Sequence, residues 1–254
     1  TGASVLRVGF HPLVKNSVYT AHNDLLQFWD LETQKQALKI PVEKFVMDTC
    51  SFNFSGKEML TGSKDRKIRI FDLRSSAPCV AELEAYTTGK PFSVWWCDHA
   101  DPNYQQGKGA FNYLFTVGFN KAGEREVALW DRRKLGSSKN PNVNENTNAI
   151  IRTVIDTASG PMAPFYDPDI RVMYLAGRGD TAIRYYEIVP EQPYCLHLSE
   201  FDSINVPQAA VTLLLKTVFD VNQFELARFL KLTPQEVVEV ISFKVSRHEN
   251  IAGY

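Results

Sequence analysis

The sequence repeats one pattern of strands and turns four times, and this repetition limits the possible folds more than any other feature. Each copy begins with a β-rich run, passes through a turn of small polar residues, and ends in an alternating strand that closes on an aromatic residue and an acid. The clearest overlay places 60-LTGSKDRKIRIFDLR-74 on 175-LAGRGDTAIRYYEIV-189, so that Asp65 matches Asp180. The four closing pairs are Trp29-Asp30, Phe71-Asp72, Trp130-Asp131 and Tyr186-Glu187.

Short strands at regular spacing, separated by turn residues, are typical of all-β proteins. The first two closing pairs lie about 42 residues apart, which is the period of WD repeats. Each WD repeat corresponds to one four-stranded blade of a β-propeller. We therefore predict an all-β fold, a WD-repeat β-propeller with about four to five blades.

The repeats also set the expected boundaries. We place a partial β-propeller in residues 1–245 and a short C-terminal extension in residues 246–254. Two polar stretches inside the propeller, 101–112 and 136–148, predict surface loops because they are poor in apolar residues. The blade-like repeats are expected at about 1–31, 42–74, 92–135 and 160–189, followed by a degenerate blade at 195–245.

The last part of the chain fits two secondary structures. Leu226, Phe229 and Leu230 could line one face of a helix. Alternatively, 225-ELARFLKL-232 and 236-EVVEVISFKV-245 are two strands joined by a short turn at Pro234. The β-branched residues of the second segment favour the hairpin, but periodicity alone leaves both open.

The tripeptide Arg178-Gly179-Asp180 has the letters of a cell-adhesion motif. In the repeat overlay it falls in the turn between two strands, where Asp can accept hydrogen bonds from its own turn backbone. Gly179 supplies conformational freedom in the same turn. We therefore interpret the tripeptide as a structural turn and not as an adhesion ligand.

Composition excludes several classes of function. The net charge is -1, so no global attraction to nucleic acid or to anionic membranes is expected. The four cysteines form no CxxC pair, which is typical of reduced thiols in a reducing compartment. No apolar run reaches the ~20 residues of a membrane span, so we predict no transmembrane segment. Because the chain begins with Thr1 and not with Met, we expect the natural protein to be longer.

No group of residues predicts catalysis. The strongest alternative is a metal site at Asp98, His99 and Asp101, but these residues lie where a turn is expected. Asp167 and Asp169 flank a proline and are interpreted as structural. The segment 107-GKGAFN-112 lacks the spacing of a phosphate-binding loop. We predict a protein that is not an enzyme and that uses no cofactor and no metal.

A narrower likeness lies in four stretches between residues 117 and 249. They are 117-VGFNKAGEREVALWDRRKL-135, 159-SGPMAPFYDPDIRVMYLAGRGDTAIRYYEI-188, 194-YCLHLSEFDS-203 and 220-DVNQFELARFLKL-232 with its continuation 239-EVISFKVSRHE-249. Together they resemble the propeller of the coronin family, the WD-repeat regulators of actin filaments. The resemblance implies a seven-bladed propeller, of which this chain matches the C-terminal part, and it favours strands over a helix at residues 225–245. The expected chain is then a fragment of a longer protein, or half of a split propeller, with two blade faces uncovered.

The resemblance also implies a function and a location. We expect a non-enzymatic scaffold that binds filamentous actin and regulates filament dynamics, in the cytoplasm at the actin cytoskeleton or cell cortex. The branched-actin nucleating complex and anionic phosphoinositides are further expected partners. A phosphoinositide-dependent membrane adaptor is the alternative function.

Basic residues in the repeat turns are the expected contacts with an acidic partner. The turn between the second and third strands of each blade should emerge on one face of the propeller, and several repeats carry Lys or Arg there or just after the closing pair. Arg69 and Arg184, which share a strand position, are interpreted instead as pairing groups between blades. The expected actin-binding residues are Lys64, Arg66, Lys67, Lys121, Arg125, Arg132, Arg133 and Arg178.

Overall fold

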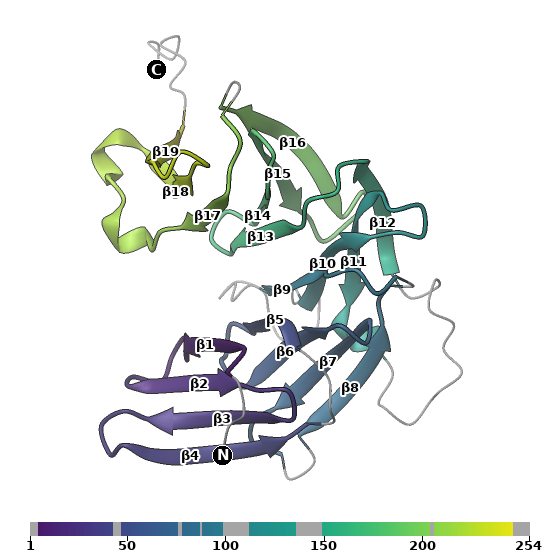
Figure 1. Ribbon diagram of the computed structural model, residues 1–254, viewed down its shortest axis with the longest axis vertical. Helices are drawn as coiled ribbons and strands as arrows, with labels where there is room; N and C mark the ends of the chain where they lie inside the picture. Colours follow the sequence, from purple (N-terminus) through teal and green to yellow (C-terminus); the bar gives the residue numbers. More distant parts are fainter. Residues whose placement is uncertain are drawn as a thin grey trace, which may run out of the picture.

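The fold is an open arc of five antiparallel sheets in a computed structural model of the chain (Figure 1). The structure describes residues 5–42, 47–75, 78–86, 88–98, 112–135, 149–203 and 206–245. The expected loop at 136–148, the extension at 246–254, His99 and the expected loop at 101–112, except for Asn112 in β10, lie outside these residues. The all-β propeller arrangement predicted from the repeats is confirmed.

Each sheet is a meander in which consecutive strands pair. The first sheet contains β1 (Arg7–Phe10), β2 (Ser17–Ala21), β3 (Leu25–Asp30) and β4 (Lys35–Pro41). The second contains β5 (Met47–Phe52), β6 (Glu58–Ser63), β7 (Lys67–Asp72) and β8 (Cys79–Glu84). The third contains β9 (Ser93–Asp98), β10 (Asn112–Phe119), β11 (Arg125–Asp131) and β12 (Ala149–Asp156).

The last two sheets continue the arc. The fourth contains β13 (Met162–Asp167), β14 (Val172–Gly177), β15 (Ala182–Ile188) and β16 (Cys195–Asp202). The fifth has three strands, β17 (Ala210–Leu213), β18 (Glu225–Leu232) and β19 (Val238–Lys244). Single 3-10 turns follow β11 at η1 (Arg132–Lys134) and β17 at η2 (Lys216–Val218), and a third, η3 (Val221–Gln223), precedes β18. None of the described helices approaches the length and apolar character needed to cross a membrane.

One expected repeat boundary is wrong, and the choice between a helix and a hairpin near the C-terminus is resolved. Residues 195–202 were assigned to the last repeat, but they form β16 and pair with β15, because the fourth strand of each sheet follows the closing aromatic–acid pair. Residues 225–232 and 238–244 form an antiparallel hairpin, as the strand interpretation required. Side chains along β18 alternate between buried and half-buried, the period-2 pattern of a strand with one face against a neighbouring sheet.

The hydrophobic core is divided into four clusters, one between each pair of neighbouring sheets. Trp130 and Trp96 lie in the cluster between the second and third sheets, and Phe229 lies between the fourth and fifth. Apolar side chains are exposed at both ends of the arc, with Phe10 73% exposed on β1 and Val240 62% exposed on β19. Burial between sheets therefore supplies most of the apolar packing, as expected for a repeat architecture.

Candidate functional site

The turns that follow the second strand of each sheet lie at corresponding strand ends in all five sheets, and we call this side of the arc the turn end. It comprises residues 22–24, 64–66, 120–124, 178–181 and 233–237 together with the loops that enter each inner strand. Hydrogen bonds hold the entry loops against three of these turns or the strand ends beside them. Ala85 N–H donates to Arg66 O, Thr88 Oγ1 donates to Phe119 O, and Gly179 N–H donates to Gln208 O.

Five of the expected contact residues lie at the turn end or directly beside it on three successive sheets. Two of them are already paired, since Arg66 forms an ion pair with Glu84 at 2.9 Å and Lys67 forms one with Glu82. The other three are exposed and form no ion pair within the described residues; they are Lys64, Lys121 and Arg178. These three side chains are the part of the expected basic surface that is free to meet a partner.

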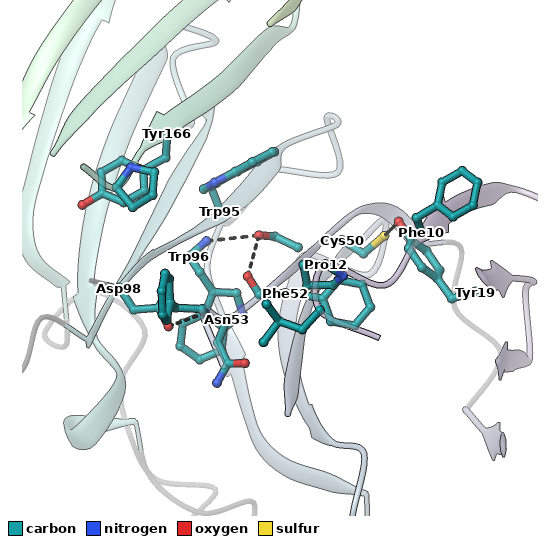
Figure 2. Close-up of a pocket in the computed structure, with 14 residues that line it drawn as sticks. Phe10, Pro12, Tyr19, Cys50, Phe52, Asn53, Trp95, Trp96, Asp98 and Tyr166 are labelled. Atoms are coloured by element: carbon teal, nitrogen blue, oxygen red, sulfur yellow. Dashed lines mark hydrogen bonds between the residues drawn. The ribbon is translucent and has the colours of Figure 1, made fainter. Parts of the chain in front are cut away.

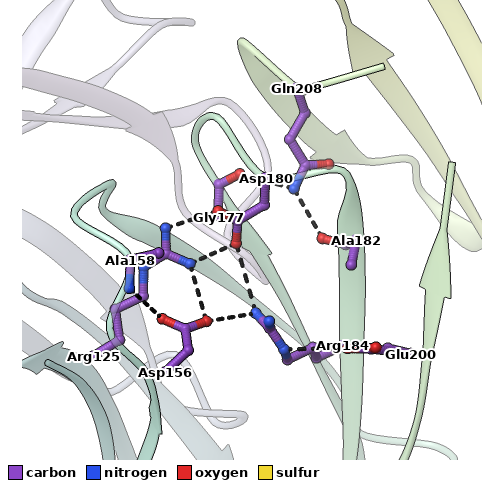
Figure 3. Close-up of polar contacts among 9 residues, drawn as sticks. All are labelled: Arg125, Asp156, Ala158, Gly177, Asp180, Ala182, Arg184, Glu200 and Gln208. Atoms are coloured by element: carbon purple, nitrogen blue, oxygen red, sulfur yellow. Dashed lines mark hydrogen bonds and ion pairs between the residues drawn. The ribbon is translucent and has the colours of Figure 1, made fainter. Parts of the chain in front are cut away.

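Arg125 was expected on the same surface, but the structure buries it. Its side chain is 1% exposed, and its guanidinium contacts Asp180 of the fourth sheet through Nη1–Oδ2 at 2.5 Å and Nη2–Oδ1 at 2.8 Å (Figure 3). Asp156 lies 3.5 Å from the same Nη1 atom. Arg125 faces the next sheet because it begins β11 on the side that packs there, so its assignment as a surface contact was wrong.

Arg132 and Arg133 also do not join the turn end. They follow β11, whereas Arg125 begins it, so the length of the strand separates them from the turn-end residues. Arg132 pairs with Glu58 of the second sheet at 3.0 Å, and Arg133 pairs with Asp131 at 2.8 Å. The eight expected residues therefore do not form one continuous basic surface.

The Arg178-Gly179-Asp180 turn is held from inside the protein. Gly179 has a φ of +88°, a conformation that favours glycine. The Asp180 carboxylate accepts the two hydrogen bonds from Arg125 and does not bond its own turn backbone within the described residues, unlike Asp65, whose Oδ1 accepts from Lys67 N–H at 3.2 Å. The carboxylate is thus occupied, which supports the interpretation as a structural turn.

Arg69 and Arg184 were both expected to pair between blades, and their ion pairs in the structure differ. Arg69 pairs with Asp65 at 2.5 Å and with Glu82 at 2.8 Å, two ion pairs that lie within its own sheet. Arg184 reaches Asp156 of the preceding sheet at 3.0 Å, as expected (Figure 3).

The acids that close the repeats fix the turns that follow them. Asp30, Asp72 and Asp131 each accept a hydrogen bond from the backbone N–H two residues later, at 2.9, 3.0 and 2.9 Å. Burial opposes the ionised form of Asp131, but hydrogen bonds from Arg133 outweigh it and hold the pKa of this carboxyl below its ordinary value. The physical role of the aromatic–acid pair is therefore to bury the ring and cap the next turn.

The remaining acids that could have suggested chemistry have structural partners. Asp98 accepts a hydrogen bond from Phe54 N–H at 2.7 Å. Asp167 contacts Lys216 Nζ at 2.6 Å, and Lys216 also pairs with Asp169. No group of three potential metal ligands occurs among the described residues.

Sequence reasoning missed a buried hydrogen-bond network around Thr116. The Thr116 hydroxyl accepts from Trp130 Nε1 at 3.1 Å and from the Tyr86 hydroxyl at 3.2 Å, and it joins the second and third sheets. Trp29 Nε1 donates to Thr20 Oγ1 at the same distance in the first sheet. The recurrence of the Thr–Trp pair, as at Thr20 and Trp29, could have revealed these hydrogen bonds from the sequence. In both sheets the Thr lies on the strand that pairs with the strand of its Trp.

An aromatic pocket of about 420 Å³ lies among the inner strands, away from the turn end (Figure 2). Phe52, Trp95 and Tyr166, from three different sheets, are among its walls. Each comes from an inner strand, β5, β9 or β13, and the repeat pattern did not identify them as a group. The pocket offers apolar and aromatic surface without a catalytic constellation.

Comparison with known proteins identifies the family, although the chain matches no protein-family model. Coronin-A of Dictyostelium discoideum is 36% identical over 206 residues, which cover 81% of this chain and 40% of that protein. Human Coronin-2A is 31% identical over 247 residues, 94% of this chain and 42% of that protein. The WD40 domain of Toxoplasma gondii coronin superposes with a TM-score of 0.81 at 25% identity, over 97% of this chain and 57% of that one. The chain thus spans about two fifths of the length of these two relatives, and over that length it belongs to the coronin family of WD-repeat β-propellers.

Proposed function

We propose that this chain is part of a non-enzymatic scaffold that binds actin filaments through the turn end and regulates filament dynamics. The observation that carries the proposal is the placement of Lys64, Lys121 and Arg178, which are exposed at the same end of three successive sheets. Membership of the coronin family directs the choice of partner. The place of action that follows is the actin cytoskeleton.

Electrostatics gives this surface a defined role. Filaments present acidic surface, and a group of cations on one rim orients an acidic partner and raises the association rate more than it raises affinity. Each exposed ion pair contributes only ~0.2–1 kcal/mol, so several must act together. The neighbouring pairs Arg66–Glu84 and Lys67–Glu82 reduce the free charge, so the attraction rests on the three unpaired cations together with Lys90, which is exposed in the loop before β9 and lies over the Phe119 ring.

The direct test is co-sedimentation of the purified protein with actin filaments at increasing salt. We expect the bound fraction to fall as ionic strength rises through the physiological range, where the Debye length is about 8 Å. Failure to pellet with filaments at any salt would reject the proposal. Flotation with vesicles containing anionic phosphoinositides, in a protein that does not pellet with filaments, would favour the membrane-adaptor alternative.

A further inference from the structure

A second pocket, of about 280 Å³, lies at the turn end among the third, fourth and fifth sheets. Residues of the inner strands β9, β13 and β17 line it, together with Arg178 and Gln208 from the adjoining turns. Its volume is near the lower limit of the ~300–1,000 Å³ that small-ligand pockets occupy. The pocket can hold one or two amino-acid residues but not a large cofactor.

The walls of this pocket let a peptide backbone come close. Ala163, Ala176, Gly177 and Ala210 are among the lining residues, so few side-chain atoms project into the space. The inner strands β13 and β17 each lie at the edge of their sheet and have a ladder partner on one side only. Such edges present backbone N–H and C=O groups that can pair with an extended segment.

Gln208 places an unused hydrogen-bond acceptor in the lining. Its side chain is 1% exposed, and its Nε2 donates to Gly177 O at 2.8 Å and to Ala182 O at 3.0 Å. Its Oε1 atom has no partner in the described part of the chain, and Figure 3 shows this oxygen on the side away from Arg125. A buried acceptor without a donor costs about 1–3 kcal/mol, so an N–H group supplied by a ligand would be favoured there.

Arg178 supplies the only positive charge among the described lining residues. Its guanidinium is exposed at the rim, and its backbone is fixed by the bond from Arg178 N–H to Pro161 O at 2.9 Å. One arginine suits a single carboxylate, which it can bind through two hydrogen bonds. A phosphoinositide headgroup carries several phosphates and would need more cations than this pocket offers.

We propose that the pocket binds a short acidic segment of a partner protein. A carboxylate of the segment pairs with Arg178, a backbone N–H donates to Gln208 Oε1, and a small apolar side chain occupies the space between β13 and β17. This inference goes beyond filament binding and does not depend on it.

The test is fluorescence polarisation with the whole chain and a fluorescein-labelled peptide of sequence GADAG, compared with the uncharged peptide GANAG. We expect saturable binding of GADAG and binding of GANAG that is weaker by about fivefold or more, the upper range for one exposed charge pair. Arg178→Glu and Ala210→Phe should each weaken GADAG binding by at least the same factor, by charge reversal and by filling the pocket. The controls are Lys121→Glu, with the same charge change on another turn, and Thr212→Phe, on the same strand outside the lining.

Each outcome decides the proposal. Weakening by Arg178→Glu and Ala210→Phe but not by the two controls supports it, provided that all variants keep the parent melting temperature. Absence of saturable GADAG binding, or equal binding by Ala210→Phe and the parent, overturns it. Binding of inositol trisphosphate that Arg178→Glu abolishes, in a protein that does not bind GADAG, would assign the site to a headgroup and likewise overturn it. Since Lys121→Glu should weaken filament binding and Ala210→Phe should not, failure of one proposal is distinguishable from failure of the other.

Discussion

Arg125 and Asp180 join the third and fourth sheets through a two-point ion pair, with Nη1–Oδ2 at 2.5 Å and Nη2–Oδ1 at 2.8 Å. Burial disfavours the charge on Arg125, but hydrogen bonds and the charge of Asp180 outweigh it and raise the pKa of the guanidinium. Arg125 therefore keeps its positive charge. It also fixes the turn from which Arg178 projects, because Asp180 belongs to the same turn.

Replacing Arg125 with Met should destabilise the protein by about 3 kcal/mol, at the lower end of the ~3–5 kcal/mol that loss of one partner of a buried ion pair costs. A cost at the lower end is expected because Arg184 Nη1 remains 3.6 Å from Asp180 Oδ2 and still compensates part of the negative charge of this carboxylate. Urea unfolding measures the change. Arg74→Met is the matched control, since Arg74 pairs with Asp72 while 61% exposed and should cost under about 1 kcal/mol. Equal costs for the two variants would contradict the assigned role.

Thr116→Val tests the hydrogen-bond network between the second and third sheets. Valine keeps the shape but removes the acceptor of Trp130 Nε1, whereas the Tyr86 hydroxyl can still donate to Glu126 O at 3.2 Å. A buried donor left without a partner costs about 1–3 kcal/mol, and the midpoint of urea unfolding should fall accordingly. Thr20→Val removes the equivalent acceptor of Trp29, which is only half-buried, and should cost less because water can replace the bond. A larger loss for Thr20→Val than for Thr116→Val would refute this explanation.

The repeat pattern predicted the second and third strands of each sheet because the closing aromatic–acid pair marks where the third strand ends. Trp130-Asp131 closes β11, and Phe71-Asp72 closes β7. The fourth strands were not assigned, since β4, β8 and β12 carry no closing pair and their residues continue into turns without a distinct signal. The sequence thus located the third strand of a repeat, which ends in a closing pair, and missed the fourth strand that follows it.

The site was predicted less well because it depends on how neighbouring sheets face each other. Asp65 and Asp180 align in sequence, yet Asp65 is held by Arg69 of its own sheet and Asp180 by Arg125 of the preceding sheet. An overlay of repeats gives the position of a residue along a strand but not the partner across an interface. Arg125 was therefore placed on the surface, whereas Arg178, at the tip of its turn, was placed correctly there.

Glu225 should make stability depend on pH in the acid range. Hydrogen bonds from Arg228 and Ser242, opposed by burial and helped by Asp220 N–H, lower the pKa of this carboxyl from 4.5 to about 2. A carboxyl whose pKa is lower in the folded state stabilises the fold above its unfolded pKa, and that contribution disappears as pH falls from 4.5 toward about 2.

The Glu225→Gln variant isolates this contribution from those of other carboxyls. Its free energy of unfolding should fall less steeply than that of the parent between pH 4.5 and about 2, because it lacks one group that takes up a proton on unfolding. Urea titrations at several pH values in this interval measure both slopes. Parallel slopes for parent and variant would show that Glu225 does not have a lowered pKa in the folded protein.

Charge reversal at the turn end and at the opposite strand ends tests where filaments bind. Lys64→Glu with Lys121→Glu changes two exposed lysines at the turn end, and Lys57→Glu with Lys134→Glu makes the same change at the opposite end. We expect only the first pair to reduce co-sedimentation with actin filaments, by about twofold to thirtyfold at low salt, since each exposed charge contributes ~0.2–1 kcal/mol. The effect should shrink as salt screens the charges. A stronger loss from Lys57→Glu with Lys134→Glu would move the contact surface to the end that carries Arg132 and Arg133.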